Sequence, residues 1–70
     1  MKQLFIEIYQ KVFDEAGNTR ACGRTVCKQL IQLAQQLDPN NNYGDLTTGF
    51  IEIQNMHKLY TDIIKEVELS

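Results

Sequence analysis

The longest helical pattern in the chain lies in residues 48–68, which read TGFIEIQNMHKLYTDIIKEVE. Apolar residues recur there at alternating steps of three and four, the spacing that places side chains on one face of an α-helix. These residues are Ile53, Met56, Tyr60, Ile63 and Val67. The stripe spans fewer than three heptads, which is too short to indicate a coiled coil. The pattern therefore predicts a helix over residues 48–68 with one face in a core.

The chain before this helix divides into two further segments with helical periodicity. Gly17-Asn18 and residues 38–44 are rich in the residue types that interrupt helices and form turns. The segments bounded by these breaks carry apolar residues at helical spacing, which predicts helices over residues 2–16 and 19–37. The sequence thus predicts an all-α fold, a three-helix bundle built by a single small domain over residues 1–70.

Two glycines indicate where the first helix ends and where the second begins, and two cysteines lie near that start. Gly17 suits the position just after a helix, where a left-handed residue ends it. Gly23 would cost about 1 kcal/mol inside the second helix, unless a neighbouring helix approaches it closely, so a later start near Arg24 stays open. On a helix that includes both, Cys22 and Cys27 lie about 140° apart around the axis. We therefore expect two free thiols that pack as small apolar groups, with poor geometry for a disulfide.

The apolar faces of the first and third helices cover about half of each helix, more than one core contact requires. Ile6, Ile31, Leu59 and Leu69 are the residues that we expect to be left outside the core. Small chains often gain stability by association. The sequence therefore predicts a homodimer of helical chains, with Ile6, Leu59 and Leu69 in the interface.

Charge is unevenly distributed along the chain. Seven Lys and Arg against nine Asp and Glu give a net charge of −2, which disfavours non-specific binding to polyanions. Arg20, Arg24 and Lys28 nevertheless recur every four residues and would form a basic ridge, with Ile31 beside it as an apolar anchor. Tyr43 in the linker either packs on the core or faces a partner. We therefore name Arg20, Arg24, Lys28, Ile31 and Tyr43 as candidate partner-binding residues.

No arrangement of residues predicts catalysis, a cofactor or a metal. Cys22 and Cys27 have the spacing C-x4-C, and His57 follows thirty residues later, whereas zinc sites use tighter pairs and further ligands. The linker from Asp38 resembles the start of a calcium loop, but Gly49 occupies the position where such a loop needs a bidentate Glu. We expect a protein that is not an enzyme.

These observations predict a small interaction module that acts through apolar helix faces, as an inhibitor, adaptor, immunity factor or structural subunit. A dimeric regulator that binds nucleic acid through the basic ridge is the alternative. A thiol-dependent enzyme is a distant third. No apolar run approaches the ~20 residues that cross a bilayer, and no targeting segment is evident, so we expect a cytoplasmic protein with reduced thiols.

Overall fold

The computed structural model describes residues 1–44, 46 and 49–69. It contains the helices α1 (Lys2–Val12), α2 (Arg24–Leu37) and α3 (Phe50–Leu69). The described residues form no strand, and their β-type pairing is one isolated antiparallel bridge between Phe13 and Thr19. The predicted all-α fold with three helices is confirmed.

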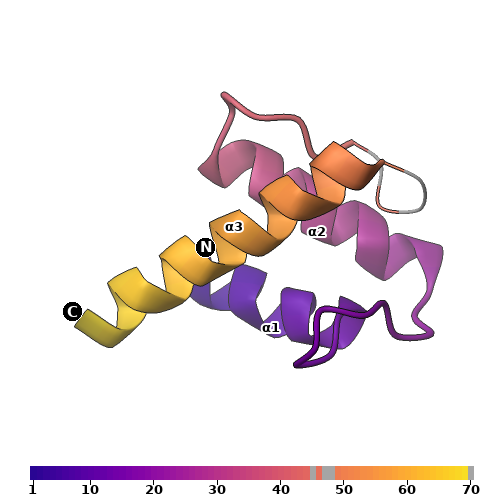
Figure 1. The fold of residues 1–70 in the computed structure, drawn as a ribbon, viewed down its shortest axis with the longest axis horizontal. Coiled ribbons are helices and arrows are strands. Elements are labelled where there is room, and N and C mark those ends of the chain that lie inside the picture. Colours follow the sequence, from indigo (N-terminus) through magenta and orange to yellow (C-terminus); the bar gives the residue numbers. More distant parts are fainter. Residues whose placement is uncertain (45, 47–48, 70) are drawn as a thin grey trace.

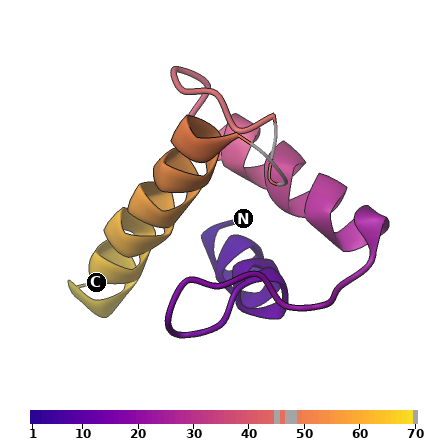
Figure 2. The same cartoon turned by 45° about the vertical axis from the view of Figure 1, so that its right-hand side comes forward.

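The first helix is the shared partner of the other two. The ribbon of α3 crosses that of α2 in Figure 1, and in Figure 2 the two helices spread apart from the upper part of the view. Figure 2 shows α1 between their separated ends, and α1 contacts both helices. This arrangement explains why the apolar face of α1 is wide, since one short helix supplies the contacts for two neighbours.

The core takes side chains from every helix and from the connections between them. The buried apolar residues are Phe5, Ile6, Ile8, Tyr9, Val12, Phe13, Leu30, Leu33, Ala34, Tyr43, Leu46, Met56 and Ile63. Burial of one large apolar side chain stabilises a fold by about 1.5–3 kcal/mol. The dense set on α1 makes this helix the centre of the core.

The first helix ends at Val12, four residues before the predicted end. Phe13 has an extended backbone, and a tight turn follows in which the Gly17 N–H donates to the Asp14 carbonyl at 3.0 Å. The Asp14 side chain accepts from the backbone N–H groups of Ala16 and Asn18, at 2.9 and 2.8 Å. An aspartate that bonds to nearby backbone in this way competes with the helix, which explains the early end. Gly17 has the predicted positive φ, 84°, but in this turn rather than directly after the helix.

The second helix begins at Arg24, as the alternative start predicts, and not at residue 19. Gly23 is its N-cap residue, with an extended backbone and no side-chain cap. A side chain on Gly23 would meet nothing within 4 Å, so the predicted close approach of a neighbouring helix is wrong. Cys22 consequently lies outside the helix and Cys27 inside it, which overturns the angle of 140° expected for one shared helix.

The linker packs on the core through its large side chains. Tyr43 is 1% exposed and Leu46 is buried, and the Tyr43 hydroxyl donates to Asp38 Oδ2 at 2.6 Å. Of the two alternatives left open for Tyr43, the structure shows packing on the core, and Leu46 packs there with it. The third helix begins at Phe50 instead of the predicted residue 48, which lies outside the described residues.

Apolar side chains do remain outside the core, but most of them are not the predicted ones. The exposed large apolar residues in the described part of the chain are Met1, Leu4, Phe50, Ile51, Val67 and Leu69. Ile6 is 6% exposed, so its predicted place outside the core is wrong, because the wide face of α1 meets two helices. Ile31 and Leu59 are half-buried against the core, and only Leu69 is fully outside, at 88% exposure.

Candidate functional site

A groove of about 470 Å³ lies beside the N-terminal half of α2. It is bounded by α2, by the segment that enters α2, by the end of α1 and by the linker. Its lining residues are Val12, Thr19, Arg20, Cys22, Arg24, Cys27, Lys28, Ile31, Gly44 and Leu46. We call this feature the α2 groove. Four of the five predicted partner-binding residues line it, although no pattern in the sequence indicates that a groove separates them from the linker.

Three exposed cations edge the α2 groove. Arg24 and Lys28 lie one turn apart on α2. Arg20 lies before the helix and is held near it because its backbone N–H donates to the Val12 carbonyl at 2.7 Å. The predicted ridge on one continuous helix is therefore wrong in form, yet the three cations line one groove. Among the described residues none of them forms an ion pair, and the ion pair found there joins Lys2 to Glu66.

The start of α2 adds to this positive charge. The free N–H groups at a helix N-terminus carry about half a positive charge, and acidic side chains in the first turn usually offset it. The first turn of α2 contains no acidic residue, begins with Arg24 and lacks a side-chain cap. Each unfavourable charge at a helix end costs about 0.3–1 kcal/mol. The local sequence thus weakens the helix and leaves a positive end that attracts anions.

Between the cations the lining is apolar. Val12 and Leu46 are buried core residues that reach the groove, and Ile31 is half-buried along its side. Such a surface matches a ligand that carries both acidic and apolar groups. Tyr43, the fifth predicted residue, lies in the core with its hydroxyl on Asp38, so it has almost no surface to offer a partner and its predicted binding role is wrong.

The two thiols also line the α2 groove, and they meet there. The Sγ atoms of Cys22 and Cys27 are 3.6 Å apart, and both residues are half-buried. Burial, followed by the hydrogen bond with Cys22, raises the pKa of the Cys27 thiol. Sequence reasoning missed this contact because it placed both cysteines on one helix. The signal that could have found it is Gly23, since a helix that begins after Gly23 leaves Cys22 free to fold back.

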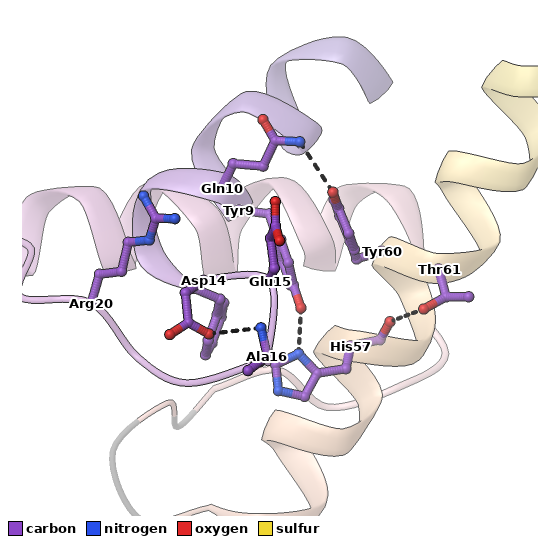
Figure 3. Close-up of a pocket in the computed structure, with 11 residues that line it drawn as sticks. Tyr9, Gln10, Asp14, Glu15, Ala16, Arg20, His57, Tyr60 and Thr61 are labelled. Atoms are coloured by element: carbon purple, nitrogen blue, oxygen red, sulfur yellow. Dashed lines mark hydrogen bonds between the residues drawn. The ribbon is translucent and has the colours of Figure 1, made fainter.

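A second cleft, of about 720 Å³, lies between α1, the turn after it and the middle of α3 (Figure 3). The Tyr9 hydroxyl lies 2.5 Å from His57 Nδ1, and the Tyr9 ring stacks on Tyr60 with centroids 3.7 Å apart. Gln10 Nε2 donates to the Tyr60 hydroxyl at 3.1 Å, and the Phe13 ring meets His57 edge to face. This polar and aromatic cluster joins α1 to α3. Of its members, Tyr60 was named from the sequence as part of the apolar stripe and His57 was weighed beside the cysteines as a metal ligand, but their contact with Tyr9 was not predicted.

The protonation of this cluster follows from burial. Burial is the first cause that raises the pKa of Tyr9 to about 12, followed by the nearby Tyr60 and Asp14, and burial lowers the pKa of His57. At neutral pH the tyrosine therefore keeps its proton and the imidazole is neutral, and the tautomer of the ring decides which of the two groups donates. The bond between them gives each of these part-buried groups a hydrogen-bond partner, which buried polar atoms need for stability.

The described residues form neither a metal-binding cluster nor a membrane-spanning helix. No group of three or more His, Cys, Asp or Glu side chains is placed to hold a metal ion there. None of the helices in that part of the chain combines the length and apolar character needed to cross a membrane. Comparisons of the chain with protein-family models, with curated proteins and with solved structures found no match.

Proposed function

We propose that this chain is a non-catalytic protein-binding module whose α2 groove takes an acidic, amphipathic segment of another protein. The single observation that carries this proposal is the convergence of Arg20, Arg24 and Lys28 around one apolar groove. The partner's acidic side chains would pair with the cations, and its apolar side chains would cover Ile31 and Leu46. An inhibitor, adaptor, immunity factor or structural subunit would work in this way, and we place it in the cytoplasm.

The charge of the whole chain favours a protein partner over nucleic acid. Non-specific binding to DNA or RNA rests on neutralising many phosphates, and a net charge of −2 opposes it. The apolar lining of the groove also has no role against a phosphate backbone, whereas it suits the leucine or phenylalanine of an amphipathic segment. Nucleic acid is therefore an outcome for the test to detect rather than a second proposal.

Nuclear magnetic resonance can test the groove without knowledge of the natural partner. The ¹⁵N-labelled protein is titrated with a synthetic amphipathic helical peptide of Glu and Leu, and separately with the same peptide carrying Lys for Glu. We expect the acidic peptide to shift the amide signals of Arg24, Lys28 and Ile31, and the basic peptide to leave them unchanged. Equal shifts with both peptides, or shifts confined to other residues, would contradict the proposal. Binding of duplex DNA at low salt that Arg24→Glu abolishes would favour the nucleic-acid alternative.

Self-association belongs to the same proposal. Lys2 pairs with Glu66, which joins the start of α1 to the end of α3, and the exposed apolar residues Met1, Leu4 and Leu69 belong to these two ends. We propose this end of the molecule as the homodimer contact. Sedimentation velocity of the wild type and of Leu69→Lys tests it. A wild-type dimer that the variant converts to a monomer supports the contact, and a monomeric wild type contradicts it.

A further inference from the structure

Cys22 and Cys27 occupy two positions whose side chains often contact each other across a helix start. With Gly23 as N-cap, Cys22 is the residue before the cap and Cys27 is the fourth residue of α2. Apolar side chains at these positions commonly pack together and fix the angle at which the chain enters the helix. Here that contact consists of two sulfur atoms 3.6 Å apart. The start of α2 at Arg24 therefore brings the two sulfur atoms together.

We propose that Cys22 and Cys27 form a reversible intramolecular disulfide, which makes the pair a redox-modification site at the start of α2. A disulfide has an S–S distance of about 2.05 Å, so the sulfurs must approach by about 1.6 Å. Gly23 gives the backbone room to follow, because its Cβ position faces open space and glycine is the most permissive residue. The proposal concerns the thiols alone and does not depend on what binds in the α2 groove.

The oxidant that we name is a low-molecular-weight disulfide such as glutathione disulfide. The Cys22 thiolate attacks one of its sulfurs, which forms a mixed disulfide and releases the first glutathione thiolate. Cys27 then loses its proton and attacks Cys22 Sγ, which forms the protein disulfide and releases the second glutathione thiolate. The protein loses two protons and two electrons in total, and the glutathione disulfide is reduced to two glutathione thiols. The same two steps with the cysteines exchanged give the same products.

The sequence makes this disulfide easy to detect. Arg24 lies between the two cysteines, so trypsin separates them into the peptides 21–24 and 25–28. The folded protein is equilibrated with a glutathione redox buffer, remaining thiols are blocked in acid, and the tryptic peptides are identified by mass spectrometry. We expect the two peptides to remain joined, and the intact protein to have lost two hydrogens. Cys22→Ser and Cys27→Ser are the matched controls, and each should carry one glutathione instead.

The same equilibrium, measured in concentrated urea, shows whether the fold favours formation of the disulfide. The fold favours the disulfide by the same factor by which the disulfide stabilises the fold. For a loop of six residues the chain-entropy relation gives about 40-fold. We therefore expect the ratio of disulfide to dithiol to be higher in the folded protein by about this factor. A ratio no higher than that of the unfolded chain, or glutathione on both cysteines without joined peptides, would overturn the proposal.

Discussion

Replacing Gly17 by alanine tests the turn that ends α1 and directs the chain toward the α2 groove. Gly17 has a φ of 84°, a backbone region in which an L side chain costs about 1–2 kcal/mol. Alanine restricts the unfolded chain and recovers about 0.4–1 kcal/mol of this cost. The new Cβ would lie 3.6 Å from His57 Nε2, an ordinary contact that adds no clash. The expected net effect is a destabilisation of about 1 kcal/mol.

Gly23→Ala is the matched control, because it makes the same change at a φ of −71° in open space. Alanine is a poorer N-cap than glycine, but it also restricts the unfolded chain, so we expect a change within about 0.5 kcal/mol. Thermal unfolding followed by circular dichroism gives the comparison. The Tm of Gly17→Ala should fall by about 4–8 °C, and that of Gly23→Ala should stay close to the wild type. Equal Tm values for the two variants would refute this account of the turn.

Three further predictions concern the linker, the histidine and the start of α2. Tyr43→Phe removes the donor to Asp38 and should cost about 1 kcal/mol in urea unfolding at neutral pH. That hydrogen bond is the first cause of the lowered pKa of Asp38. Its stabilisation is therefore present above the unfolded pKa of 3.8 and is lost as the pH falls through the folded pKa, so the stabilities of the wild type and Tyr43→Phe should converge there. Burial lowers the pKa of His57, so its ring signals should titrate with a midpoint below 6.5. The folding free energy linked to the neutral ring is fully present above pH 6.5 and is lost as the pH falls through that midpoint. A midpoint above 6.5 would contradict the burial. Gly23→Ser adds the missing cap, which contributes a few tenths of a kcal/mol over glycine, and restricts the unfolded chain by about 0.4–1 kcal/mol, so it should raise the stability by about 1 kcal/mol in the same thermal assay. An unchanged Tm would argue against Gly23 as the N-cap.

Periodicity predicted the helices well because it depends on burial, which extends over whole elements. It placed the ends of the first two helices poorly because single residues decide them. Phe13 keeps the helical spacing of α1 and is buried, yet it does so from an extended backbone. The Asp14 side chain forms the turn that interrupts α1, and nothing in the apolar pattern distinguishes it from a solvent-facing helical residue.

The candidate site was predicted only in part, because spacing along the chain indicates shared faces but not how separate segments pack together. A spacing of four residues identified Arg20, Arg24 and Lys28 together, and their common groove follows from α2 and from the bond between Arg20 and Val12. The contact of Leu46 with the groove depends on how the linker crosses the core, which no local pattern encodes. Tyr9 and His57 are 48 residues apart, and their contact likewise depends on tertiary packing.

The proposed binding of an acidic, amphipathic segment in the α2 groove is tested most directly by the affinity of the acidic peptide for charge-reversed variants. Arg24→Glu replaces an attraction at the edge of the groove with a repulsion, and Lys65→Glu makes the same change of charge on an exposed residue of α3 outside it. Calorimetric titration should show that Arg24→Glu weakens binding about tenfold while Lys65→Glu leaves it nearly unchanged. An equal loss in both variants would mean that only net charge matters, and unchanged binding in Arg24→Glu would mean that the peptide binds elsewhere. Either result would contradict a binding site in the α2 groove.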